Sequence, residues 1–189
     1  MSIFDYLMVL LSVVLSLGLV HLLNGIASLF HSRTRVLWSS VYLLWMVEVL
    51  ILHFDFWVYT WSMNARTEYT VGEIGLVFLL VSAIYLTATA LVPKFPARGT
   101  INLYVTWQRI RIEFLAVYLA YLGLILVLNL ISFRTWEAMM MNNLFYVFPY
   151  IILAGLALAF PNKHVQRLAV GIIVALDLFR YIFVQPSIS

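Results

Sequence analysis

Residues 36–61 read VLWSSVYLLWMVEVLILHFDFWVYTW, an apolar run that carries a carboxylate, Glu48, near its midpoint. About 20 predominantly apolar residues are enough for a helix to cross the ~30 Å hydrocarbon core of a bilayer. The run therefore predicts a transmembrane helix with an ionisable group deep inside it.

Five further apolar runs extend this pattern to both ends of the chain, which is 65% hydrophobic and 10% charged over 189 residues. The six predicted spans cover residues 3–30, 36–61, 71–92, 109–133, 138–160 and 165–184. Because the spans leave no segment for a soluble unit, we expect one transmembrane domain over residues 1–189. The predicted fold class is all-α, a polytopic membrane protein built as a bundle of six transmembrane helices. Pro149 predicts a kink inside the fifth span.

Several classes of chemistry are excluded or disfavoured by composition. The chain has no cysteine, which excludes disulfides, Cys-ligated zinc, iron–sulfur clusters and thiol catalysis. It has no phosphate-binding loop and no metalloprotease or nucleophile-elbow motif, so an enzyme ranks below the other function classes. The predicted depths of His21 and His53 differ by roughly 15 Å, which does not suit two ligands of one haem. We expect no cofactor and no metal.

The first run is too long for the apolar core of a secretory signal, so we expect no cleaved leader. Orientation follows from Lys and Arg, which are enriched in cytoplasmic loops. The breaks after spans one, three and five hold Arg33, Arg35, Lys94, Arg98, Arg109, Arg111, Lys163 and Arg167. The opposite side holds Arg66, Arg134 and Arg180. This imbalance predicts that both termini face away from the cytoplasm.

Ionisable residues inside membrane spans are rare and usually face the bundle interior, a cavity or each other. An ionised Glu48 would cost several kcal/mol at its depth unless it were protonated, paired or hydrated. Asp55 lies two helical turns further on and shares the face of Glu48, whereas His53 is rotated about 140° away. Other spans bring polar groups to the same outer half, where Asp5 and Glu73 begin their spans and are expected to be solvated.

The candidate ligand- or ion-binding residues are Glu48, His53, Asp55, Asn129, Asp177 and Arg180. One hypothesis is a polar cavity that opens to the outside, with Glu48 at its floor and His53 and Asp55 along the approach. Such a cavity would bind a small cation, a proton or a polar ligand, as in a small transporter or channel-like protein. The alternative is internal bracing, in which Arg180 neutralises Asp55 or its i,i+3 neighbour Asp177. His53 and Asn129 would then form hydrogen bonds across helices, in a non-catalytic accessory, scaffold or sensor subunit of a membrane complex.

The rest of the predicted bundle holds fewer candidate functional residues. Gly18, His21, Gly25 and Ser28 form a stripe suited to close helix packing. Arg109 and Glu113 have the i,i+4 spacing of a boundary pair, and Trp107 is expected at the inner membrane interface. The expected partners are the lipid bilayer and a second copy or another membrane protein. The scattered basic residues do not predict a nucleic-acid surface.

The stretch Phe4-Asp5-Tyr6 through Leu17-Gly18-Leu19-Val20-His21-Leu22-Leu23-Asn24-Gly25 resembles the start of a family of short, six-span bacterial inner-membrane proteins of unknown function. The run Leu43-Leu44-Trp45 with His53-Phe54-Asp55-Phe56-Trp57 is similar too, so that about the first third of the chain is covered. The resemblance implies a location in the bacterial inner membrane. It brings no activity and no site residues.

Overall fold

The computed structural model describes residues 3–63, 70–93, 99–132 and 135–183. Four basic residues used above to predict orientation lie outside these ranges, namely Arg66, Lys94, Arg98 and Arg134. Within the described residues the fold is almost entirely helical, which confirms the predicted all-α class.

The helices are α1 (Ile3–His31), α2 (Ser40–Ser62), α3 (Val71–Leu91), α4 (Leu103–Ser132), α5 (Trp136–Tyr146), α6 (Phe148–Ala159) and α7 (Lys163–Phe183). A short 3-10 turn (Arg33–Arg35) leads into β1 (Val36–Leu37), which pairs in parallel with β2 (Ile101–Asn102). This pairing ties the segment after α1 to the segment before α4.

Five helical segments are long and apolar enough to cross a membrane: α1, α2, α3, α4 and the combined α5–α6 segment. α7 differs in charge, because its 21 residues include Lys163, Arg167, Asp177 and Arg180. Many large apolar side chains on the outside of the bundle are exposed, among them Val13, Leu79, Leu130 and Ile152. Such a surface suits lipid, and the chain is a membrane-embedded protein with at least these five apolar segments.

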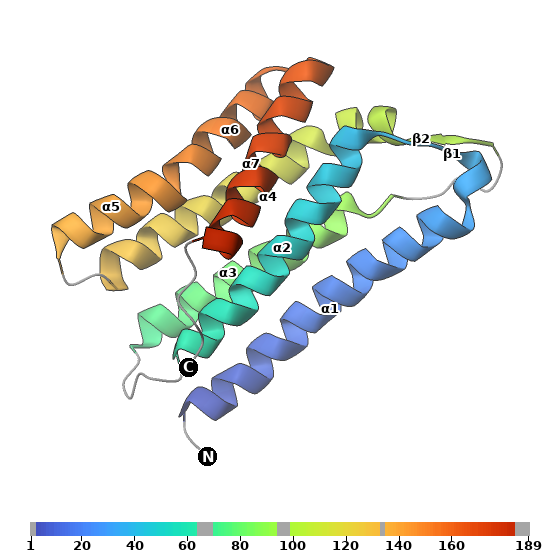
Figure 1. Ribbon diagram of the computed structural model, residues 1–189. Helices are drawn as coiled ribbons and strands as arrows, with labels where there is room; N and C mark the ends of the chain where they lie inside the picture. Colours follow the sequence, from blue (N-terminus) through green and yellow to red (C-terminus); the bar gives the residue numbers. More distant parts are fainter. Residues whose placement is uncertain (1–2, 64–69, 94–98, 133–134, 184–189) are drawn as a thin grey trace.

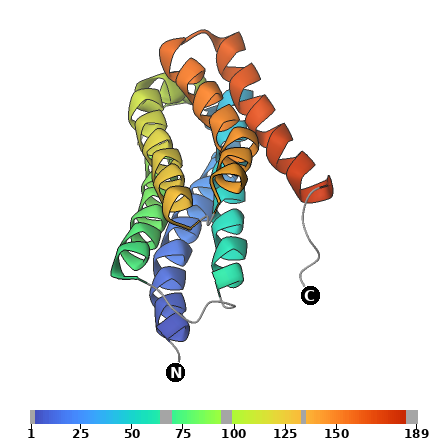
Figure 2. The same cartoon turned by 90° about the vertical axis from the view of Figure 1, so that its left-hand side faces the viewer.

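The helices form a ring in which α2 contacts α3, α3 contacts α4, α4 contacts α6, α6 contacts α7, and α7 returns to α2. α1 packs outside this ring against α3 and α2, and α5 continues the line of α6 (Figures 1 and 2). α7 starts beside the end of α6 and runs back across the bundle at a visible tilt (Figure 2). The interior of the ring is therefore lined by five helices.

The fifth span is interrupted close to Pro149, where a kink is predicted. α5 ends at Tyr146 and α6 begins at Phe148, with Val147 between them outside helical geometry (φ −122°, ψ −50°). Pro149 lies in the first turn of α6, where its missing N–H leaves no helical hydrogen bond unmade.

Two glycines let α1 approach its neighbours closely. A Cβ atom on Gly18 would lie 3.3 Å from Tyr85 Cα on α3, and one on Gly25 would lie 2.9 Å from Val92 Cγ2. Both glycines are buried, as the packing prediction requires, but His21 and Ser28 are exposed, so that half of the predicted stripe is wrong. The buried face of α1 instead continues through Leu22 and Leu29.

An aromatic cluster joins α2 to α4. The rings of Trp45 and Trp107 are stacked with centroids 5.5 Å apart, and Phe114 meets Trp45 edge-on at 5.0 Å. The side chain of Trp107, which is expected at the inner membrane interface, is fully buried within the bundle, and its indole N–H donates to Gln166 Oε1. A polar partner on α7 satisfies the buried indole.

Two residues expected near the membrane boundaries are buried and cap helices. Arg111, counted above among the loop charges, donates from Nη1 to the carbonyls of Ala157 and Leu158 at the end of α6. Glu73 is 5% exposed rather than solvated, and it forms a capping box with Thr70 at the start of α3. Both use ionic side chains to satisfy backbone groups that a helix end leaves open.

Candidate functional site

Glu48 lies on α2 and has none of its surface exposed. Its Oε1 atom accepts a hydrogen bond of 2.8 Å from the hydroxyl of Tyr118 on α4. The Tyr118 ring is held edge-on against Trp45, with centroids 5.4 Å apart. Because Trp45 precedes Glu48 by three residues, both lie on the same face of α2. The aromatic cluster therefore positions the donor that serves the buried carboxyl group.

Asp177 on α7 is the second buried carboxyl group, with 2% of its surface exposed. Tyr150 on α6 donates a hydrogen bond of 2.6 Å to Asp177 Oδ1. Glu48 and Asp177 are neighbouring carboxyl groups in the interior of the ring. Their remaining oxygens, Glu48 Oε2 and Asp177 Oδ2, are buried and accept no hydrogen bond from a described donor. Two carboxyl groups can share a hydrogen bond only when one of them carries a proton.

Arg180 on α7 supplies the cation of this site. Its Nη2 atom pairs with Asp55 on α2 and lies 3.4 Å from Asp177 Oδ1. The predicted i,i+3 salt bridge between Asp177 and Arg180 is confirmed. The side chains of Arg180 and Asp55 keep 25% and 21% of their surface exposed. We call Glu48, Asp55, Asp177 and Arg180 the carboxyl cluster.

Exposure within the carboxyl cluster falls with depth. Asp55 and Arg180 are partly accessible, Asp177 is nearly closed, and Glu48 is closed. Asp55 follows Glu48 by seven residues, which is about 10 Å along α2. The cluster is thus a string of ionic groups that runs from a partly accessible pair to a fully buried carboxyl group.

His53 does not belong to the carboxyl cluster. Its Nδ1 atom lies 2.7 Å from the carbonyl oxygen of Val49, one turn earlier on α2. Its Nε2 atom faces α1, where a Cβ on Gly18 would approach it to 2.8 Å. His53 therefore lies at the contact between α1 and α2 and not on an approach to Glu48. The predicted rotation of His53 away from the face of Glu48 accounts for this placement.

Asn129 is also separate from the carboxyl cluster. Its Nδ2 atom donates a hydrogen bond of 2.6 Å to Asn143 Oδ1 on α5. This contact joins α4 to α5 near their connection, and it is the kind of polar bracing between helices that the alternative hypothesis describes.

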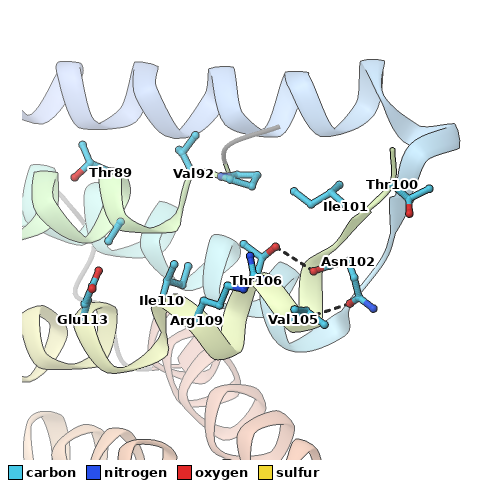
Figure 3. Close-up of a pocket in the computed structure, with 12 residues that line it drawn as sticks. Thr89, Val92, Thr100, Ile101, Asn102, Val105, Thr106, Arg109, Ile110 and Glu113 are labelled. Carbon is cyan, nitrogen blue, oxygen red and sulfur yellow. Dashed lines mark hydrogen bonds between the residues drawn. The ribbon is translucent and has the colours of Figure 1, made fainter. Parts of the chain in front are cut away.

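The expected cavity with Glu48 at its floor does not match the closed surroundings of this residue. Pockets are found elsewhere among the described residues. One of about 300 Å³ lies between α1 and α2 and is lined by Ser16, His53 and Trp57 among others. A larger one of about 760 Å³ lies between the end of α3 and the start of α4 (Figure 3). Among the described residues no group of three His, Asp or Glu side chains could hold a metal ion.

Tyr118 and Tyr150 are the site residues that the sequence interpretation missed. A usable signal exists in the predicted spans, because Glu48, Tyr118, Tyr150 and Asp177 all lie nine to twelve residues from the same end of the bundle. At 1.5 Å per residue this is roughly 14–18 Å, the middle of a ~30 Å hydrocarbon core. The chain has eleven tyrosines, and depth alone narrows them to a few candidates. The rotation of each helix then decides which of these tyrosines faces the two carboxyl groups.

Comparison of the chain with protein-family models, with curated proteins and with solved structures gives no match.

Proposed function

We propose that the protein is a small transporter or channel-like protein that moves protons, or a small cation in their place, through the carboxyl cluster. The observation that carries this proposal is the burial of two neighbouring carboxyl groups, Glu48 and Asp177, on different helices. Such a pair is the arrangement in which one proton is shared and can be exchanged.

Charge balance supports the proposal. The carboxyl cluster contains three carboxyl groups and one guanidinium, so full ionisation would leave a net charge of −2 inside the bundle. An uncompensated buried charge is strongly destabilising, at several kcal/mol per ion. Binding of protons at Glu48 and Asp177 would remove this charge without any change in the fold.

The decrease in side-chain exposure from Asp55 to Glu48 supports a path for protons through the carboxyl cluster. A proton that arrives at the partly exposed Asp55 would meet Asp177 next and Glu48 last. The closed state of Glu48 is then the occluded conformation of a cycle, and a shift of the tilted α7 relative to α2 would open it. Both helices carry cluster carboxyl groups, so a relative shift would also change the contact between them.

We further propose that α7 is the sixth span, with Asp177 and Arg180 turned to the interior of the ring. Ionic residues inside a bundle are tolerated when they pair with each other. Six spans would place both termini on one side, away from the cytoplasm by the distribution of Lys and Arg. The resemblance of the first third to short bacterial inner-membrane proteins supports that membrane as the location.

Proton flux into proteoliposomes tests the proposal, with an entrapped pH-sensitive dye and a potential set by potassium and valinomycin. We expect flux from the natural protein and none above background from Glu48→Gln. The amide can still accept from Tyr118 and can donate to Asp177, so this variant should fold. Glu137→Gln, which removes a surface carboxylate at the start of α5, is the matched control and should keep the flux. Absence of flux from the natural protein, for protons and for sodium or potassium, would rule the proposal out.

A second candidate function is an accessory or scaffold subunit, favoured by the contact between Asn129 and Asn143 and by the ion pair between Asp55 and Arg180. These contacts join neighbouring helices whether or not anything moves through the bundle. An accessory subunit would show no flux, and Glu48→Gln would leave both its thermal stability and its capture of a membrane partner nearly unchanged.

A further inference from the structure

The largest of the pockets described above lies at the end of the bundle opposite the open end of the carboxyl cluster. It occupies about 760 Å³ between the last turn of α3, β2 and the first turns of α4. Figure 3 shows Arg109 and Glu113 rising from the same side of α4, toward Val92 and Thr89 of the α3 segment. The pocket therefore contains two opposite charges that are one helical turn apart.

Neither of these two charges is neutralised by a residue in the described part of the chain. The predicted boundary pair is wrong, because Arg109 and Glu113 form no ion pair with each other or with another residue in the described part of the chain. Both side chains are exposed, and Glu113 lies ten residues inside α4. An exposed carboxylate this far into a membrane helix is costly in lipid but not in a water-filled pocket. The pocket explains how Glu113 is accommodated.

The hydrogen-bonding groups of the pocket are sorted along α4. Near the start of α4 the pocket offers donors, the Arg109 guanidinium and the Asn102 amide nitrogen, while Asn102 Oδ1 is already used to cap α4. One turn further along α4 it offers acceptors, the Glu113 carboxylate and the Thr89 hydroxyl oxygen, whose proton is donated to Leu86. A ligand that satisfies both sets has an anionic group near the start of α4 and an ammonium group one turn further on.

We propose that this pocket binds a small water-soluble zwitterion of the amino-acid type, held by Arg109 at its carboxylate and by Glu113 at its ammonium group. The rise between these residues is about 6 Å, so a ligand whose charges are separated by several atoms fits better than glycine. A zwitterionic phospholipid fits poorly, because its ammonium group would point to water and not toward the bilayer centre. This inference rests on its own residues and does not depend on the carboxyl cluster.

Direct binding to the detergent-solubilised full chain tests the inference, with 4-aminobutanoate as the probe in isothermal titration calorimetry. Butanoate and butylamine, which each carry one of the two charges, should bind at least tenfold more weakly. Arg109→Gln and Glu113→Gln should each weaken 4-aminobutanoate at least tenfold. Arg167→Gln, at an exposed basic residue at the same end of the bundle and outside the pocket, should bind as the natural protein does.

Melting temperatures of all three variants establish that each is folded, which is expected since the residues are exposed. Binding that is absent for 4-aminobutanoate, or that the Arg109 and Glu113 variants leave unchanged, would overturn the inference. Displacement of bound phosphatidylethanolamine by the two pocket substitutions, without amino-acid binding, would also overturn it and assign the pocket to lipid.

Discussion

Glu48 on α2 accepts a 2.8 Å hydrogen bond from Tyr118 on α4, and neither side chain has any exposed surface. The bond engages Oε1 of the Glu48 carboxyl group, while Oε2 is buried without a donor in the described part of the chain. Asp177 on a third helix lies nearby, so Glu48 is placed where three helices of the ring meet.

Tyr118→Phe should destabilise the protein by about 1–3 kcal/mol, because Glu48 Oε1 loses its donor in a place that water does not reach. Chemical unfolding in detergent, followed by the fluorescence of the tryptophans, measures the loss. Tyr6→Phe is the matched control, since Tyr6 is 70% exposed, and it should have no effect. Equal stability of the two variants would show that the Tyr118 bond contributes nothing.

Arg180→Gln should be more destabilising than Asp55→Asn, because it leaves two carboxyl groups without their cation while the second change leaves the cation paired with Asp177. The partial exposure of the pair keeps the loss below the ~3–5 kcal/mol of a fully buried pair. The double variant should lose less than the sum of the single losses. Strict additivity would mean that Arg180 and Asp55 do not interact in the membrane.

Gly18→Ala should destabilise the protein by about 1–3 kcal/mol, because the new Cβ would meet His53 Nε2 at 2.8 Å and Tyr85 Cα at 3.3 Å. Gly75→Ala is the control within a helix, since no atom lies within 4 Å of the place its methyl group would take, and it should gain up to about 1 kcal/mol. Thermal unfolding of both variants provides the comparison. A gain from Gly18→Ala would contradict the close approach of α1 to α3.

Cysteine labelling tests whether α7 crosses the membrane, and the natural chain gives no background because it has no cysteine. Ile172→Cys, at an exposed apolar position near the middle of α7, should resist a membrane-impermeant maleimide. Lys163→Cys should react from one side and Ser189→Cys from the other. Reaction of Cys at 163 and 189 from the same side would show that α7 does not span the bilayer.

Much of the fold follows from the sequence, because apolar runs of membrane length have few alternatives to a helix. All six predicted spans are helical in the described residues, five of them are long and apolar enough to cross a membrane, and Pro149 marks the break between α5 and α6. The ion pairs of Arg180 follow from spacing and depth. The rotation of each helix about its axis is harder to predict, because a helix that is apolar on every side does not reveal which side faces the interior of the bundle. The buried positions of Trp107 and Arg111 could not be predicted for this reason.

The partners of Glu48 depend on which helices become neighbours, and this depends on packing between residues far apart in the chain. Spacing on α2 alone predicts that Asp55 shares the face of Glu48. The same spacing cannot predict that Asp177 and Tyr118 lie beside Glu48, because these residues belong to α7 and α4. The pocket around Arg109 and Glu113 is hidden in the same way, because their spacing fits an intrahelical pair equally well.

The central claim is that the Glu48 and Asp177 pair holds and releases a proton inside the bundle. Infrared difference spectroscopy of the protein in lipid, recorded after a change of pH, detects the C=O stretch of a protonated carboxyl group and its shift in D₂O. We expect a band that is present in the natural protein and in Glu137→Gln, and absent from both Glu48→Gln and Asp177→Asn. A spectrum without a protonated carboxyl band at any pH at which the protein stays folded, or a band that survives both substitutions, would contradict the account.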